Sequence, residues 1–326
     1  MKLPALDELI NESHPFQVHL KCDFAGVKTR EGLILRGPCG FGEFAPFKHH
    51  SPEHAALWLA AAIEMAYDPV EDVERMEIPV NAIIPMLSAQ ETIDYVSHAL
   101  SQGVKSFKVK CGSEDFAEDF ARVMAVRETA QLASIRVDAN GKWNVQQAKD
   151  RIFELNTFAT LEYVEQPVAT LDEMKQLRDL IDVPLAIDEN IRLSKNVSAK
   201  DLQMAADIAI LKAIPSGGVR KALELAEQID MPIVVSGSMD TSVGLAAGLK
   251  LAANIKDLYG ACGLGTGNLL ETDLASTLVP VNGVIKVQAL EPNEQLLEKS
   301  ARMMSQAEKD FCHNLLVTCY EILEKM

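Results

Sequence analysis

The sequence predicts an α/β barrel that follows a smaller segment of mixed α and β structure. From about residue 78, short β-branched runs alternate with amphipathic stretches, which is typical of parallel strands joined by crossover helices. Eight such units lie in roughly 200 residues, and this is the size and strand count of a (β/α)8 barrel. A doubly wound open sheet is the alternative that the pattern leaves open.

The eight runs are short and apolar. They begin at Ile78, Ser106, Ser134, Leu161, Pro184, Asp207, Pro232 and Tyr259. Between them lie stretches such as ETIDYVSHALSQ, in which apolar residues recur at the i, i+3 and i+4 spacing of a helix face. The first 77 residues differ: strands are expected at 16–20 and 33–36, followed by a glycine-rich turn and a helix that opens at Ser51 and Pro52.

Composition excludes several classes of function. The formal net charge is −16, so the chain has no basic surface for nucleic acid, and anionic membranes would repel it. No run of 18 or more apolar residues predicts a membrane span, and the first residues lack the apolar core of a signal peptide. The six cysteines form no CxxC pair, which favours reduced thiols in a cytoplasmic protein.

Two lysines share one face of the second run. Side chains two residues apart on a strand point the same way, so Lys108 and Lys110 face one side together. If that side is the barrel interior, two confined ammonium groups disfavour each other's charge, which suits a lysine that acts as a base. Taken alone, the pattern is better explained by two surface lysines on an edge strand.

Three successive runs then end in a carboxylate. Asp138, Glu165 and Asp188 lie at the carboxyl ends of their strands, where barrel active sites form. Because converging carboxylates repel one another, the set predicts a hard divalent cation, and Mg²⁺ would keep positions open for substrate and water. The structural alternative for any one of them, above all Asp188, is a helix N-cap in a βα loop.

A third lysine, Lys212, ends the sixth run. In a closed barrel the sixth strand lies across the mouth from the second, so Lys212 would face Lys110 over the metal. A lysine at the end of an apolar strand is costly to bury without a role. A Schiff-base lysine is the competing functional interpretation, and the three carboxylates argue against it.

Further residues are candidates for binding substrate. Ser236, Gly237 and Ser238 precede a helix, and their backbone N–H groups would suit a substrate carboxylate or a phosphate. The loop at 214–218 offers the same chemistry.

Other polar residues lie near the predicted site. Arg136 and Asn140 share the face of Asp138; Arg136 either orients substrate or forms a structural ion pair. Glu189 is expected to point away from Asp188. His50 and His54 are four residues apart at a helix start outside the barrel, where surface positions are expected.

The order of motifs KVK, RVDAN, VEQP, AIDEN and ILK resembles the enolase superfamily, in its muconate-lactonising branch, over nearly the whole chain. Within that branch, REGLILRGPCGFGEFAPF, PVNAIIP and VVSGSMDTSVGL resemble the o-succinylbenzoate synthases. The resemblance implies a (β/α)7β TIM-like barrel at 78–279. It also implies an α+β capping domain built from residues 1–77 and 280–326.

The resemblance also implies an activity. The three strand-end carboxylates would bind Mg²⁺, with Mn²⁺ as a substitute, and the partner would be a small-molecule carboxylate substrate. The reaction would be the dehydration of 2-succinyl-6-hydroxy-2,4-cyclohexadiene-1-carboxylate to o-succinylbenzoate in menaquinone biosynthesis. Lys110 would remove the α-proton and help hydroxide leave as water, Lys212 would stabilise the enediolate, and Lys108 would keep Lys110 basic.

Other functions stay open at this stage, among them cycloisomerisation of a muconate with the same three carboxylates. On the same scaffold, an N-succinylamino acid racemase or dipeptide epimerase would use Lys110 and Lys212 as its two bases. A phosphate-binding barrel without metal chemistry is the remote alternative.

Two segments do not follow the family pattern, and the sequence does not indicate an oligomeric state. The cap segment at 21–29 is short for a loop that covers substrate. The chain from Asn293 carries an apolar stripe expected to pack on the body or on a partner subunit. The residues of that stripe are Leu297, Met304, Phe311, Leu315 and Ile322.

Overall fold

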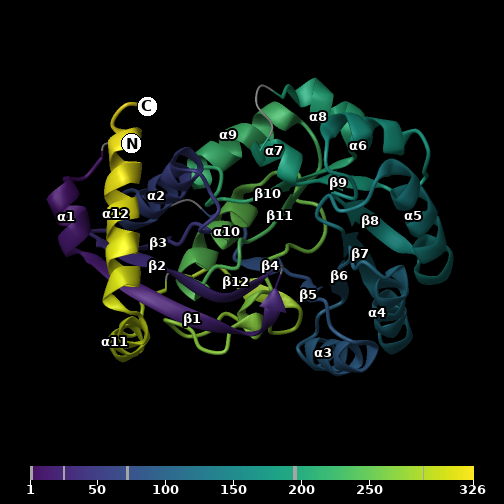
Figure 1. Ribbon diagram of the computed structural model, residues 1–326, viewed down its shortest axis with the longest axis horizontal. Coiled ribbons are helices and arrows are strands. Elements are labelled where there is room, and N and C mark those ends of the chain that lie inside the picture. Colours follow the sequence, from purple (N-terminus) through teal and green to yellow (C-terminus); the bar gives the residue numbers. More distant parts are fainter. Residues whose placement is uncertain (1–2, 25, 71–72, 194–196, 289) are drawn as a thin grey trace.

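The computed structural model describes residues 3–24, 26–70, 73–193, 197–288 and 290–326. In that part of the chain, seven parallel strands curl into one sheet in the order β5 to β11 (Figure 1). They are β5 (Ala82–Ile84), β6 (Ser106–Lys110), β7 (Ser134–Asp138), β8 (Leu161–Glu165), β9 (Leu185–Ile187), β10 (Ile208–Leu211) and β11 (Ile233–Val235). Parallel bridges from Val80 to Cys262 and from Ser236 to Gly263 connect the two outer strands through the eighth run. The predicted barrel is confirmed, with an irregular segment in the eighth position.

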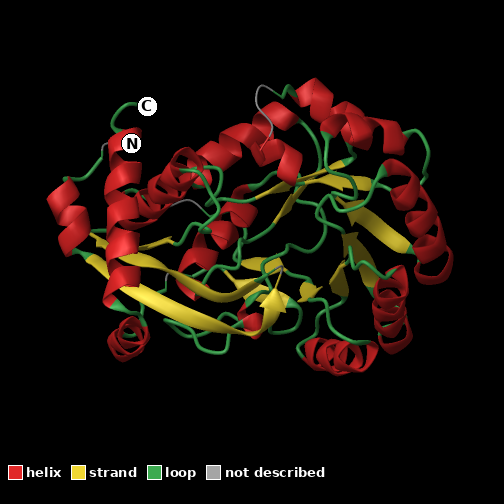
Figure 2. Ribbon diagram, in the orientation of Figure 1, coloured by secondary structure: helices red, strands yellow, loops and turns green. Residues whose placement is uncertain are grey.

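Helices cover the outside of the sheet (Figure 2). They are α3 (Ala89–Ser101), α4 (Phe116–Thr129), α5 (Val145–Ala159), α6 (Leu171–Arg178), α8 (Ala199–Ala205), α9 (Val219–Ile229) and α10 (Ser242–Asn254). The short helix α7 (Glu189–Leu193) instead follows β9 at the carboxyl end of the sheet. Capping boxes begin several of them, at Ser88, Asn144, Thr170 and Ser198, and so fix where those helices start. Among the described residues, no helix is both long and apolar enough to cross a membrane.

The strand register brings three of the predicted site residues to one level. Lys110 lies opposite Asp138 in the β6–β7 pair, and Asp138 lies opposite Glu165 in the β7–β8 pair. Parallel strands present their carboxyl ends at the same edge of the sheet, where βα loops build barrel active sites.

The N-terminal segment forms an antiparallel sheet with a helix on it. The sheet consists of β1 (Ser13–Phe24), β2 (Val27–Gly37) and β3 (Gly40–Phe44), and the helices are α1 (Leu6–Asn11) and α2 (Pro52–Tyr67). The strands and the helix start that the sequence predicts lie within these elements. Gly42 lets α2 approach β3 closely, since a Cβ there would lie 1.9 Å from the Ala62 carbonyl oxygen.

The C-terminal segment returns to the cap. Two short strands, β4 (Glu77–Pro79) and β12 (Val284–Lys286), pair at the border between cap and barrel, and a 3-10 turn, η1 (Gly267–Leu269), lies between α10 and β12. Helices α11 (Glu294–Met303) and α12 (Gln306–Leu323) follow, and α12 lies alongside α1 and α2 (Figure 1). The Ser300 hydroxyl bonds both backbone groups of Gln17 at 2.7 Å. The C-terminal helices therefore pack on their own chain, while domain borders at 77 and 280 stay a prediction.

The apolar face of α12 differs from the predicted stripe. Cys312, Leu316 and Cys319 are buried, whereas Phe311 is 46% exposed. The sequence stripe assumed one continuous helix, but the chain breaks at Met304 and a capping box at Ser305 begins α12 in a new phase. The prediction of Phe311 as a packing residue is wrong for this reason.

Replacing Leu316 tests how much α12 contributes to the fold. The Leu316→Ala change removes a fully buried side chain and leaves a cavity, so we expect the free energy of unfolding to fall by about 2–5 kcal/mol. Chemical denaturation measures it. Phe311→Ala on the same helix is the matched control and should cost less than about 1 kcal/mol. Equal losses in the two variants would contradict this packing.

Candidate active site

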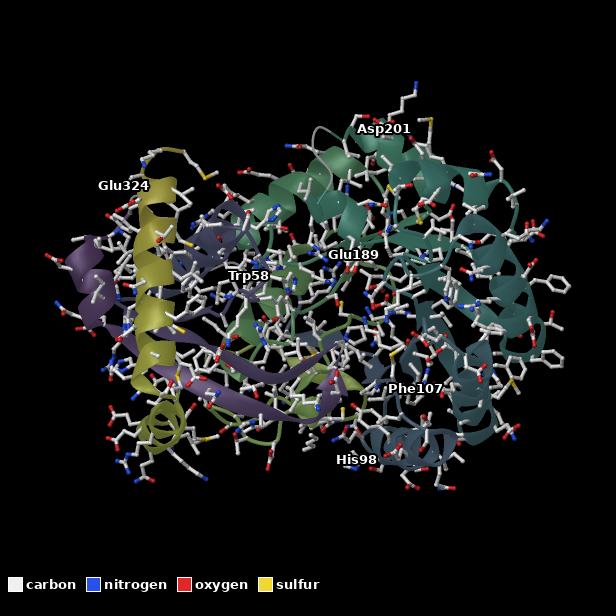
Figure 3. All side chains as sticks on the ribbon, in the orientation of Figure 1. Trp58, His98, Phe107, Glu189, Asp201 and Glu324 are labelled. Carbon is white, nitrogen blue, oxygen red and sulfur yellow. The ribbon has the colours of Figure 1, made fainter. Side chains whose placement is uncertain are left out.

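A cavity of about 400 Å³ lies between the barrel mouth and the cap. The barrel contributes charged residues at the strand ends, and the cap contributes aromatic residues. Trp58 of α2 and Glu189 of α7, which are both labelled in Figure 3, line this cavity from the cap and from the barrel. The site is therefore shared between the two ends of the fold.

The three lysines of the predicted site each bond a carboxylate of the predicted metal set. Lys110 Nζ lies 2.5 Å from Asp138 Oδ2, and Lys108 Nζ lies 2.9 Å from both Glu165 oxygens. On the other side of the mouth, Lys212 Nζ lies 2.6 Å from Asp188 Oδ2. The structure thus brings together all six charged residues that the strand pattern selected.

Lys108 is the most enclosed of these lysines. Burial opposes its charge, but the carboxylates of Glu165 and Asp138 outweigh burial and raise the pKa of Lys108. The expectation that burial and a neighbouring like charge lower the pKa of this lysine is wrong, because Lys108 lies between two carboxylates. The raised pKa favours a positive charge on Lys108 beside Lys110.

The carboxylates have unequal pKa values although all are buried. Burial alone would raise the pKa of Asp138, but the charges of Lys110 and Lys108 outweigh burial, so that its pKa is lowered. The pKa of Asp188 is also lowered, since Lys212 and Arg192 outweigh burial. Burial and the charge of Asp138 raise the pKa of Glu165 to about 7. The three carboxylates are close enough to repel one another.

This donor set fits a hard divalent cation in its chemistry. It consists of carboxylate oxygens from three adjacent strand ends, and their mutual repulsion favours a cation among them. In the part of the chain that the structure describes, no three carboxylate, histidine or cysteine side chains already converge as a metal site. Ammonium groups hold the carboxylates instead, so a metal would have to displace them.

Asn140, shortly after Asp138, and Glu189, directly after Asp188, also belong to the charged group. Asn140 has a positive φ of 47°, and its side chain accepts from Lys110 and donates to Glu189. Glu189 lines the cavity, contrary to the expectation that it points away from Asp188. That expectation assumed a continuing strand, but α7 begins at Glu189 itself.

Arg136 does not reach the cavity. It is 1% exposed, and its guanidinium donates to both carboxylate oxygens of Glu162 and to the Asn81 side chain. As it precedes Asp138 by two residues on the same face, it lies one layer deeper in the barrel. The prediction of Arg136 as a substrate-binding residue is wrong, and the structural ion pair is what the fold contains.

The loop with Ser236, Gly237 and Ser238 lines the cavity, but its backbone is already occupied. Their N–H groups donate to the Leu211 carbonyl, the Gly263 carbonyl and the Asp240 carboxylate. The part of the prediction that assigned an anion to these N–H groups is wrong. The second loop behaves alike, since the N–H groups of residues 216–218 all donate to carbonyls of residues 212–214.

The cap contributes residues that the sequence did not indicate as part of the site. His49, His50 and His54 line the cavity. The expected surface position is confirmed for His54, which is exposed, whereas His50 is half-buried. The end of β1 also reaches the site, and Lys110 Nζ lies 5.3 Å from the centre of the Phe24 ring. No local signal relates these segments to the barrel, because the contact arises only when the cap packs on it.

Comparison with known proteins agrees with this geometry. Residues 91–292 match the family described as enolase C-terminal domain-like, and residues 16–66 match the one described as enolase N-terminal domain-like. The chain belongs to the enolase superfamily. Members of this superfamily generally bind Mg²⁺, and pairing that ion with a lysine or histidine base is a known pattern.

Some individual members of the superfamily have high sequence identity to this chain. The chain is 42% identical to the o-succinylbenzoate synthase of Mycolicibacterium smegmatis over 89% of this chain and 90% of that protein. It is 39% identical to the enzyme of the same name from Mycobacterium leprae, over 98% and 95%. A dipeptide epimerase from Enterococcus faecalis, solved with Mg and the dipeptide L-Leu-L-Tyr, has a TM-score of 0.70 at 18% identity, covering 86% of this chain and 97% of that one.

A buried carboxylate of the cap forms hydrogen bonds with the barrel next to the site. Glu43 Oε2 of β3 accepts from the Thr241 N–H at 3.1 Å, the Thr241 hydroxyl at 2.5 Å and the Gly244 N–H at 3.2 Å. These donors form the first turn of α10, directly after the Ser238 loop. Burial and the neighbouring charge of Asp240 raise the pKa of Glu43 to about 8.

This pKa predicts a pH-dependent stability. Between its ordinary pKa of 4.5 and about 8, Glu43 binds more proton in the folded than in the unfolded protein. The free energy of unfolding should therefore fall as pH rises through that window. Urea denaturation at about pH 5.5 and 8.5 measures the difference, and Glu43→Gln should shrink it while lowering stability at both values.

The exposed glutamate Glu154 gives the matched control, and Glu154→Gln should keep the pH difference of the parent protein. An unchanged difference in Glu43→Gln would show that Glu43 does not titrate in this range.

Proposed function

We propose that this chain dehydrates 2-succinyl-6-hydroxy-2,4-cyclohexadiene-1-carboxylate to o-succinylbenzoate, a lyase reaction of menaquinone biosynthesis. About 40% identity to o-succinylbenzoate synthases over most of both chains supports the activity. The observation that carries the mechanism is the pair of lysines on opposite sides of one mouth, each bonded to a strand-end carboxylate.

The reaction needs a base on one face of the substrate's α-carbon. Lys110 is suited to it by position, since it lines the cavity and its Nζ is held in place by Asp138 and Asn140. After taking the α-proton, Lys110 returns it to the departing hydroxide, so that water leaves and the ring becomes aromatic. One group thus acts first as base and then as acid.

The other cations stabilise negative charge as it develops on the substrate carboxylate. Asp138, Glu165 and Asp188 would hold Mg²⁺, which supplies a fixed positive charge next to that carboxylate when it is bound. Lys212 contributes its ammonium group from the opposite side. Lys108, which lies between Glu165 and Asp138, keeps a positive charge close to Lys110.

The same arrangement would permit racemisation, because Lys110 and Lys212 face the cavity from opposite strands. An N-succinylamino acid racemase is therefore the second candidate, and the identity to o-succinylbenzoate synthases favours the dehydratase. The phosphate-binding alternative loses support, since the N–H groups of both glycine loops are occupied. A cytoplasmic location stays a prediction, with all six cysteines present as free thiols.

Removing the proposed base tests the mechanism. Lys110→Ala should lower kcat by roughly a hundredfold to ten-thousandfold, about 3–5 kcal/mol, which is typical of a positioned proton transfer. The assay is formation of o-succinylbenzoate in saturating Mg²⁺. Lys105→Ala, an exposed lysine just before the same strand, is the matched control and should keep full activity. Near-parental turnover in Lys110→Ala would remove Lys110 from the role of base.

Metal dependence is tested separately. A chelator should abolish o-succinylbenzoate formation, and added Mg²⁺ should restore it. Asp188→Asn should weaken Mn²⁺ binding, measured by electron paramagnetic resonance of the free ion, at least tenfold because it removes one anionic ligand. Asp150→Asn on the outer face of α5 is the control. Full activity in the presence of chelator would contradict the assignment of the three carboxylates.

A further inference from the structure

The proposed base is the last residue of its strand. β5 ends at Ile84, which pairs with Val109, one residue before Lys110. The turn that follows contains Gly112, whose φ of 103° ends the extended backbone. A base that removes a carbon-bound proton needs a fixed position, because a displacement of about 1 Å costs roughly a hundredfold in rate. Contacts beyond the sheet must therefore hold this strand end.

Arg122 of α4 forms such a contact. Its Nη1 atom donates to the Lys110 carbonyl at 3.0 Å, and its Nε atom donates to the Leu87 carbonyl at 2.8 Å. Leu87 lies in the loop after β5, directly before the Ser88 capping box of α3. Because the donors of a guanidinium have fixed directions, one side chain holds the end of β6 against the loop that follows the neighbouring strand.

Asp119 of the same helix holds the turn after Lys110. Its carboxylate accepts from the Gly112 N–H at 2.7 Å, the Ser113 N–H at 3.1 Å and the Ser113 hydroxyl at 2.7 Å. Arg122 Nη1 lies 2.9 Å from Asp119 Oδ1, so the two opposite charges are paired. We call Asp119 and Arg122 the α4 clamp.

The α4 clamp is buried beside the cavity residues. Asp119 is 0% and Arg122 is 2% exposed, and neither residue lines the cavity. Removing two charges from water is costly, and a well-packed apolar pair often gives equal or greater stability. An apolar pair could not form hydrogen bonds to the backbone of residues 87, 110, 112 and 113. The clamp is therefore better explained by the position that it gives this backbone than by stability.

A second arginine of α4 provides a comparison within the same helix. Arg127 also donates to backbone carbonyls, those of residues 130, 131, 133, 159 and 160. These residues lie in the connections that lead into β7 and β8, at the opposite end of the strands from the cavity. The two arginines thus make the same kind of contact at opposite ends of the barrel, and of the two only Arg122 bonds Lys110.

We propose that the α4 clamp positions Lys110 for proton transfer. This inference rests on the proposed function, because it requires Lys110 as the base. Arg122 acts through the backbone of Lys110 and is a positioning residue. The three carboxylates proposed to hold the metal follow other strands, which the clamp does not bond. Loss of the clamp should therefore slow proton transfer and leave the binding of metal and substrate in place.

Replacing Arg122 tests the clamp. Arg122→Met removes the guanidinium, and kcat for o-succinylbenzoate formation should fall about thirtyfold or more, while KM stays within about threefold. Affinity for Mn²⁺, measured by electron paramagnetic resonance of the free ion, should stay within about twofold of the parent protein. Arg127→Met is the matched control, since it removes a guanidinium of similar contacts from the same helix, and should keep kcat within about twofold.

Two further variants guard against a fold defect. Arg122→Met leaves the charge of Asp119 buried without its partner, which is destabilising in itself. The double variant Asp119→Asn/Arg122→Met removes both charges, and it should show the same loss of kcat with the near-UV circular dichroism of the parent protein. Arg122→Lys keeps a charge and a donor at this place, and it should recover part of kcat.

A double-mutant cycle separates positioning from a general defect. In a Lys110→Ala background, Arg122→Met should change the residual rate by less than about twofold, because no base is left to position. A further loss as large as in the parent protein would overturn the inference, and so would equal kcat values in Arg122→Met and Arg127→Met. If the parent protein forms no o-succinylbenzoate, or Lys110→Ala keeps its turnover, the proposed function or its base fails instead.

Discussion

Repulsion among buried carboxylates is the constraint on which this site depends. Asp138 and Glu165 end neighbouring strands at one level, Asp188 directly follows the next strand, and all three are buried. Such a group persists only with cations in contact, and Lys108, Lys110 and Lys212 provide them. The barrel therefore holds paired charges at the cavity, where an incoming metal ion and substrate can exchange partners with side chains already present.

Strand periodicity explains why much of the site could be predicted from the sequence. Alternation along β6 places Lys108 and Lys110 on one face, and the level register of β6, β7 and β8 follows from the parallel pairing of equal-length units. Side-chain alternation gave wrong predictions where a strand ended, and it did not indicate how deep in the barrel a side chain lies. Glu189 follows Asp188 as the first residue of a helix, and Arg136 shares the face of Asp138 but lies a layer below it.

Contacts between distant segments were beyond prediction. Nothing local in residues 47–58 indicates that three imidazoles face the barrel, since this depends on how α2 packs on β3. Likewise, the loop of Ser236, Gly237 and Ser238 has the composition of an anion site, yet its N–H groups are used by neighbouring strands and by Asp240. Whether a backbone N–H group is free to bind a ligand depends on the folded structure, and residue types alone do not reveal it.

The bond from Glu43 to the first turn of α10 bears on how freely the two parts of this fold could be exchanged. One cap residue completes a barrel helix, and a Cβ on Gly244 would come within 2.8 Å of Glu43 Oε2. A cap from another member could replace this one only with an acceptor at the same place and a small residue to receive it. Recombination between members, in the laboratory or in evolution, is thus confined to pairs in which the cap has this acceptor and the barrel has this small residue.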